Sequence, residues 1–244
     1  DTDPLTGQPL YSVLTGSAYS TRTNLAATFD PLRQGGVLTL GDTSTNPVTP
    51  VFDAGTLQYN GVTTTGSISW GEFTNGTAAT NTLSSTSTLS ATQYEAYVVG
   101  VTPSPDVIPP SAIARYSLLG GTTPRLNLST GGTLDAFKID VDFVRSTIDV
   151  RLDLTMSGEQ FMAKGSDIFI ETLGQDVFDL SGLTTTSSGS SCFSFCYTNI
   201  SGFFAGATRG QIGAAYNLNT GLGAITGTAG LGQGSLATYV SGSL

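Results

Sequence analysis

The chain has 244 residues and a formal net charge of −9. It is long enough to bury a substantial core, yet only 11% of its residues are charged, against roughly 25% in an average soluble domain. The acidic balance and the scattered arginines argue against nucleic acid and anionic membranes as partners. Low charge with abundant Thr, Ser and Gly is typical of secreted and cell-surface β-proteins, so we expect an extracellular location.

The chain contains no histidine. This excludes Ser-His-Asp and Cys-His catalysis, and it excludes haem or zinc bound through histidine. No apolar run approaches the roughly 18 residues of a membrane-spanning helix. We therefore predict a non-enzymatic protein with no catalytic residue, no cofactor, no metal and no transmembrane segment.

Short apolar runs alternate with polar and turn residues, and no helical period persists for three turns, so the sequence predicts an all-β fold. In the N-terminal part, strands are expected at residues 10–18, 36–40, 56–59, 62–73 and 93–101. The pair Asn60-Gly61 favours a hairpin turn between two of them. Residues 74–92 are polar and of low complexity, which is typical of an exposed loop.

Two segments bear on organisation. Residues 1–18 form an arm with one plausible strand, which lies along its own domain or crosses to a neighbouring molecule. Residues 102–111 contain Pro103, Pro105, Pro109 and Pro110 and are not suited to a central strand. This segment is the expected domain boundary.

The clearest local pattern lies between residues 134 and 156. Apolar residues alternate with charged ones in both arms, which predicts two half-buried antiparallel strands. A turn at Arg145-Ser146 pairs Val141 with Val150 and sets Asp140 opposite Arg151. The acidic residues of this face fit either a solvated surface with cross-strand ion pairs, which the sequence favours, or a Ca²⁺ site; they are Asp140, Asp142, Asp149 and Asp153.

Downstream, strands are expected at residues 113–119, 167–173 and 177–180, and residues 181–191 are expected to form a loop. Cys192 and Cys196 follow directly. A disulfide and a reduced pair are both open, and an exported protein favours the disulfide. Glycines then recur between residues 202 and 230, which indicates strands that curl strongly and close into a small barrel.

Several pieces of the sequence resemble a known family. They are Trp70-Gly71 in SWGEF, residues 94–100, residues 116–124 with Gly120-Gly121, residues 132–143, and the glycine-rich residues 202–216. Together they resemble the C-terminal region that follows a FecR domain in many proteobacterial surface proteins, related to the barrel lobes of transferrin-binding protein B. The resemblance implies a β handle-like sub-domain over residues 1–110 and an eight-stranded antiparallel barrel over residues 111–244.

The resemblance also implies structural roles for a set of motif residues: Trp70, Gly71, Gly120, Gly121, Gly202, Phe203, Gly206, Gly210, Gly213, Tyr216 and Gly227. Relatives are non-enzymatic and bind host proteins or haem at loops. Two hypotheses for function follow. The first is a structural or self-assembling protein of the cell surface, such as a fibre or adhesive component. The alternative is a surface ligand-binding module for haem or a host protein, at the bacterial outer membrane.

Overall fold

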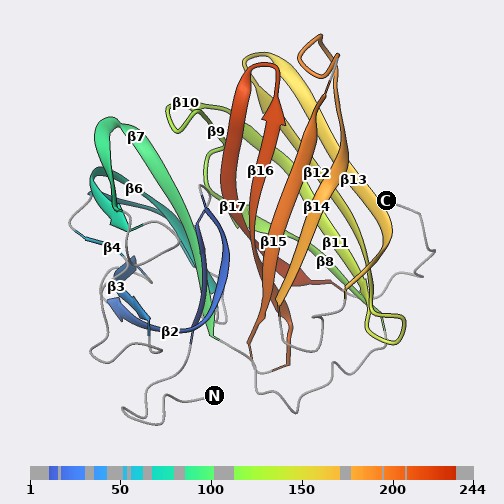
Figure 1. Ribbon diagram of the computed structural model, residues 1–244. Coiled ribbons are helices and arrows are strands. Elements are labelled where there is room, and N and C mark those ends of the chain that lie inside the picture. Colours follow the sequence, from blue (N-terminus) through green and yellow to red (C-terminus); the bar gives the residue numbers. More distant parts are fainter. Residues whose placement is uncertain are drawn as a thin grey trace.

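The computed structural model describes residues 11–15, 18–30, 36–42, 52–53, 56–62, 68–79, 86–101, 113–170, 177–193, 195–206 and 208–234. Over these residues the chain is built of antiparallel strands in two sheets, which stand side by side in Figure 1. We call them the handle sheet and the barrel. The proline-rich boundary segment lies outside the described residues, so the division near residue 110 stays a prediction.

The handle sheet has the strand order β3-β2-β1-β7-β6-β4, and β5 also pairs with β6. Its strands are β1 (Tyr11–Thr15), β2 (Ala18–Asp30), β3 (Gly36–Asp42), β4 (Phe52–Asp53), β5 (Thr56–Val62), β6 (Ile68–Ala79) and β7 (Thr86–Val101).

The strand of the N-terminal arm follows the first of its two alternatives, because β1 is paired within its own sheet, on one side with β2 and on the other with β7. Two other expectations for this half change. Asn60 and Gly61 lie inside β5, where the register with β6 shifts between Tyr59 and Gly61, so the pair marks a bulge and not a turn. Much of the expected loop at residues 74–92 is strand, since β6 continues to Ala79 and β7 begins at Thr86.

The C-terminal sheet is a closed eight-stranded antiparallel barrel. Strand β8 pairs with β11, the chain then continues through neighbouring strands to β17, and β17 pairs back with β8. The barrel strands are β8 (Ile113–Gly121), β11 (Thr133–Asp142), β12 (Thr147–Met156), β13 (Glu159–Phe169), β14 (Val177–Ser187), β15 (Tyr197–Ala205), β16 (Gln211–Thr220) and β17 (Gly223–Gln233). A short hairpin of β9 (Arg125–Leu126) and β10 (Thr130–Gly131) pairs with β17.

Two boundaries differ from those expected. The strand predicted at residues 167–173 is the end of β13, which stops at Phe169. The loop predicted at residues 181–191 is largely strand, because β14 continues to Ser187. Ser and Thr side chains suit the exposed positions of a strand as well as a loop, so polar composition alone does not distinguish the two.

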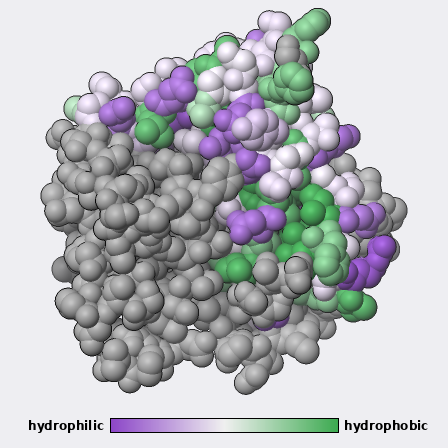
Figure 2. All heavy atoms as spheres, viewed as in Figure 1, coloured by the Kyte–Doolittle hydropathy of each residue, from purple (hydrophilic) through white to green (hydrophobic). Residues whose placement is uncertain are grey.

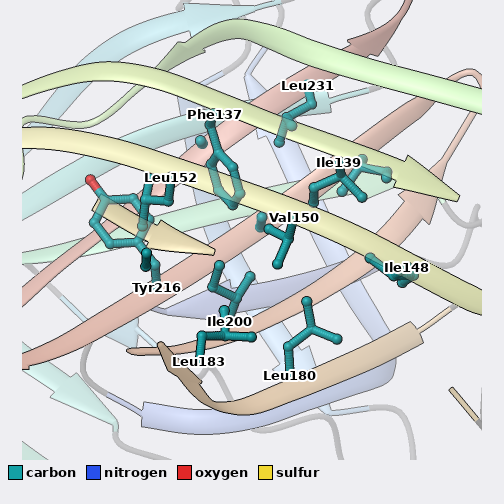
Figure 3. Packing of buried hydrophobic residues seen from close by; sticks show 14 of the residues in the cluster. Phe137, Ile139, Ile148, Val150, Leu152, Leu180, Leu183, Ile200, Tyr216 and Leu231 are labelled. Carbon is teal, nitrogen blue, oxygen red and sulfur yellow. The ribbon is translucent and has the colours of Figure 1, made fainter. Parts of the chain in front are cut away.

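One continuous core fills the barrel, formed by the inward positions of all eight strands. Alternation places Phe137, Ile139 and Val141 inward on β11 and Val150 and Leu152 inward on β12, all fully buried. Figure 3 shows Phe137, Ile139, Val150 and Leu152 directed into the same interior. The predicted apolar face of this hairpin is therefore confirmed.

The predicted register is wrong by two residues. Val141 lies opposite Ile148 and Ile139 opposite Val150, so Asp140 faces Asp149 and Lys138 faces Arg151. A shift of two residues keeps every side chain on its own face, so hydrophobic alternation does not detect it. The turn decides: the Asp142 carboxylate accepts hydrogen bonds from the backbone N–H groups of Val144 (3.0 Å) and Arg145 (2.9 Å), which starts the turn earlier than expected.

The acidic face of the hairpin is also less exposed than predicted. Asp140, Asp142 and Asp149 are buried. Arg115 on β8 donates to the Asp140 carboxylate at 2.9 Å from Nε and 2.6 Å from Nη2. Asp149 accepts from the Asp167 backbone N–H at 2.6 Å, and Asp153 pairs with Arg151 on its own strand at 2.8 Å. Each carboxylate thus has its own partner, and the four do not converge as a Ca²⁺ site would require.

The handle sheet packs against the outer face of the barrel. The contact is an apolar cluster of Ile68, Trp70 and Val98 from the handle with Phe203, Ala205 and Ala215 from β15 and β16. We call this contact the seam. Within the described residues, no helix has the length and hydropathy needed to cross a membrane.

Candidate functional site

The loop between β14 and β15 carries the most exposed aromatic side chains in the described part of the chain. Cys192 and Cys196 form a disulfide, with their Cα atoms 5.1 Å apart. Between them, Phe193 is 92% exposed and Phe195 is 90% exposed. We call residues 191–196 the aromatic loop. Figure 2 shows hydrophobic residues at the tip of this loop, at the upper right of the molecule, next to more polar surface.

Backbone hydrogen bonds attach the aromatic loop to two neighbouring hairpins. The N–H of Gly221, between β16 and β17, donates to the Ser191 carbonyl at 2.8 Å. The N–H of Ser188 donates to the Gln160 carbonyl, on β13, at 2.8 Å. The Cys192–Cys196 disulfide joins the two ends of the aromatic loop just before β15 begins at Tyr197. The two phenylalanines are therefore presented on a fixed loop, which lowers the entropy lost when a partner orders them.

An exposed pair of phenylalanines has no stabilising role within the chain. Single apolar residues at a protein surface are ordinary, but two almost fully exposed aromatic side chains on one short loop are typical of binding sites. Aromatic residues are enriched among the side chains that contribute most to protein–protein affinity. The arrangement is suited to contact with another macromolecule.

The motif residues predicted from the sequence lie elsewhere, mostly along the seam and its strands. Trp70 is 5% exposed, and its indole lies flat against two glycines. A Cβ at Gly120 would lie 2.6 Å from Trp70 Cζ2, and one at Gly230 would lie 2.6 Å from Cζ3. Gly213 leaves room for the Phe203 ring in the same way. Trp70 is thus a core residue of the seam.

The other motif residues have internal roles. Gly227 faces the barrel interior and leaves room for the Tyr216 hydroxyl, and Gly202 does so for the ring of Phe178. Gly121 packs on the Thr228 carbonyl, and Gly71 is a buried residue of β6. Gly206 and Gly210 flank the β15–β16 turn, and Gly206 has a φ of 80°. The structure therefore brings Trp70, Gly120, Phe203 and Gly213 together, and keeps all motif residues away from the aromatic loop.

Polar contacts also hold the seam. Arg125 of β9 donates to the Glu72 carboxylate at 2.8 Å, and its guanidinium carbon lies 3.8 Å from the centre of the Tyr94 ring. Glu72 is 1% exposed, so this ion pair is shielded from water. The Thr228 hydroxyl donates to the Tyr97 carbonyl at 3.0 Å. Charge and hydrogen bonding thus add orientation to the apolar contact.

Two buried tyrosines have perturbed pKa values. Burial raises the pKa of Tyr216 far above its usual range, and the nearby Glu72 carboxylate raises it further. Burial likewise raises the pKa of Tyr116, which the Arg209 guanidinium partly opposes. The Tyr116 hydroxyl donates to the Arg209 carbonyl at 2.7 Å. Both tyrosines lie in the closed core, so these shifts reflect burial and carry no sign of a catalytic role.

The sequence contains a signal for the aromatic loop. The string SCFSFC places two phenylalanines inside a short cysteine pair, flanked by Ser and Thr. Large apolar residues in such a polar surrounding have no neighbours to bury them. The disulfide closes this loop, and both phenylalanines lie within it.

Comparison with solved structures places the fold near that of bacterial binding proteins. An intact transferrin-binding protein B with N and C lobes is 12% identical, with a TM-score of 0.45, over 93% of this chain and 46% of that one. The transferrin-binding protein B of Neisseria meningitidis is 13% identical with a TM-score of 0.43, over 93% and 44%. This chain spans less than half the length of those proteins.

A structure of a single lobe gives a similar result. The N-lobe domain of lactoferrin-binding protein B of Moraxella bovis is 12% identical with a TM-score of 0.38, over 92% of this chain and 99% of that one. No protein-family model and no curated protein matches the sequence. Each of these TM-scores is below 0.5, so the function has to be inferred from the chain's own residues. An association with a FecR domain rests on the sequence resemblance alone.

Proposed function

We propose that the chain is a non-enzymatic binding module of the bacterial cell surface, and that it binds a host protein through the aromatic loop. The observation that carries the proposal is the exposure of Phe193 and Phe195, at 92% and 90%, on a loop closed by a disulfide. An anchored aromatic pair loses little conformational entropy on binding and buries a large apolar area.

The proposal takes the alternative of the two hypotheses. Self-assembly through the N-terminal arm requires a strand that has no partner in its own chain. β1 is an internal strand of the handle sheet, paired on both sides, so it does not support this hypothesis. The solved structures that resemble the chain are named for binding transferrin or lactoferrin. These names suggest which proteins to test first. The location at the cell surface is part of the proposal and is supported by the low charge and the disulfide.

The test measures binding of the full chain to transferrin and to lactoferrin by biolayer interferometry. The double variant Phe193→Ser/Phe195→Ser removes both rings and leaves the cysteines in place. The matched control is Val144→Ser/Phe169→Ser, which removes two apolar side chains, 77% and 67% exposed, at the opposite end of the barrel. Loss of two central aromatic residues is expected to weaken binding by at least about tenfold, and the control is expected to bind like the wild type.

The proposal fails if both variants bind equally well, or if neither protein binds at micromolar concentration. A haem titration followed in the Soret region addresses the other ligand of this hypothesis. Binding of haem without binding of either protein would replace the proposed partner by a small molecule. A concentration-dependent mass in light scattering would return the protein to the self-assembling class.

A further inference from the structure

A groove lies on the outer face of the barrel, where β11 begins, β12 ends, β13 begins and β14 ends. Its volume is about 550 Å³, within the size range of small-molecule sites. It lies on the strands that the handle sheet leaves free, since the seam uses β15, β16, β17 and β8. Ser187 and Ser188 belong to its lining, and the chain continues from them into the aromatic loop.

A β-bulge shapes the groove. The register of β11 and β12 shifts between Leu134 and Ala136, which leaves Asp135 as an extra residue. Its carboxylate accepts hydrogen bonds from the hydroxyls of Thr155 at 2.7 Å and Thr133 at 3.1 Å. Bulges redirect side chains and are over-represented beside functional sites. The bulge here turns a carboxylate into the groove and fixes its orientation.

The charges that line the groove are already matched. Asp153 is paired with Arg151 at 2.8 Å, and Asp135 is held by two hydroxyls. The lining has two carboxylates, fewer than the several oxygen ligands that Ca²⁺ favours, and Asp153 already balances the charge of Arg151, so neither a metal ion nor a phosphate is well matched. An ion would gain little binding free energy in this groove, so a neutral ligand is the better match.

The remaining polar groups are both donors and acceptors. The Gln160 amide and the Thr186 hydroxyl line the groove, and in the described part of the chain neither has a side-chain hydrogen-bond partner. Asp135 and Asp153 have lone pairs beyond those used by their partners. A ligand that presents several hydroxyls matches this mixture, because each hydroxyl both donates and accepts. Met162 provides an apolar patch beside these groups.

We propose that this groove binds a neutral saccharide, with Asp135 and Gln160 as its principal hydrogen-bonding residues. The site is separate from the aromatic loop but adjoins it. A protein partner that carries glycans would therefore engage both surfaces at once, whereas a free sugar would occupy only the groove. The proposal does not depend on which host protein the loop binds.

The experiment is saturation-transfer difference NMR on the full chain with glucose, galactose, N-acetylglucosamine, lactose and maltose at millimolar concentration. Asp135→Asn keeps the side-chain shape and replaces a strong double acceptor by an amide, and Gln160→Ala removes the free amide. The matched control, Asp167→Asn, changes an exposed carboxylate that pairs with Arg145 at the other end of the barrel. Thermal unfolding of each variant verifies that it is folded.

The expected result is saturation transfer to at least one sugar by the wild type and by Asp167→Asn. The dissociation constant should be at least about tenfold higher for Asp135→Asn, which loses a hydrogen bond to a charged group, and about fivefold higher for Gln160→Ala, which loses a neutral one. The absence of transfer from all five sugars overturns the proposal. Equal binding by all variants also overturns it, because the sugar would then bind elsewhere. Phe193→Ser/Phe195→Ser must leave sugar binding unchanged, which separates this test from that of the proposed function.

Discussion

The buried ion pair between Arg115 and Asp140 leads to a quantitative prediction. The Asp140 side chain is fully buried, and Arg115 donates to it at 2.9 Å and 3.1 Å from Nε and at 2.6 Å from Nη2. The variant Asp140→Asn leaves the shape unchanged and removes the negative charge. Arg115 then lies beside a neutral amide, with part of its hydrogen bonding lost.

Breaking a buried pair by removing one partner costs about 3–5 kcal/mol. The Arg115 side chain is still 26% exposed, so water screens part of the unpaired charge, and we expect a loss of about 2–3 kcal/mol. With an m-value of about 2 kcal/mol/M, the urea midpoint of the barrel should fall by about 1–1.5 M.

Asp153→Asn is the matched control. This variant makes the same change on the next strand. The Arg151 side chain is 42% exposed and the Asp153 side chain 22%, so loss of this pair should lower the free energy of unfolding by less than about 1 kcal/mol. Adding Arg115→Gln to Asp140→Asn should cost little more, because the pair is already broken. Equal losses from Asp140→Asn and Asp153→Asn would refute the reasoning, since burial would then make no difference to the value of an ion pair.

Three further predictions follow from the core and the seam. Ile139→Asp places a charge at a fully buried position and should unfold the barrel, as circular dichroism would show; a folded variant would contradict the assignment of faces. Gly230→Val places a Cβ 2.6 Å from Trp70 Cζ3 and should loosen the seam, so limited digestion with proteinase K, which cleaves with broad specificity, should degrade the handle sheet earlier than in Gly234→Val. The pKa values of Tyr116 and Tyr216 are raised in the folded protein, so folding favours their neutral form. Their contribution to stability is therefore complete below the unfolded pKa of about 10 and falls as the pH rises above it. A urea midpoint that is unchanged at pH 11 would contradict this.

Much of the barrel could be predicted from the sequence, because alternation reports which side chains face inward. The inward positions of β11 and β12 are an example. Register is a different matter. Two registers that differ by two residues bury the same side chains, and the opposite charges of Asp140 and Arg151 favoured the wrong one. The deciding interaction was the Asp142 carboxylate with two backbone N–H groups of the turn, and such a contact is weakly encoded in composition.

The handle sheet was harder to predict because its polar strands resemble loops. Residues 74–79 and 86–92 belong to β6 and β7, although Thr, Ser and Asn dominate them. Pairing with a neighbouring strand stabilises such a segment, and that neighbour can be distant in sequence. The candidate sites show the same limit. The groove depends on a bulge at Asp135 and on the proximity of β14, neither of which a single strand reveals.

The glycines of β15, β16 and β17 connect the barrel to the handle. In a strand, residues separated by an odd number lie on opposite faces. Gly227 and Gly230 are three apart, so one faces the core beside Tyr216 and the other faces the handle beside Trp70. If glycine served only to relieve crowding of side chains inside a strongly curved barrel, it would be needed on the inner face alone. The outward Gly230 and its partner Gly120 on β8 instead leave the space that the Trp70 indole occupies, which links the glycine-rich stretch to a tryptophan distant in sequence.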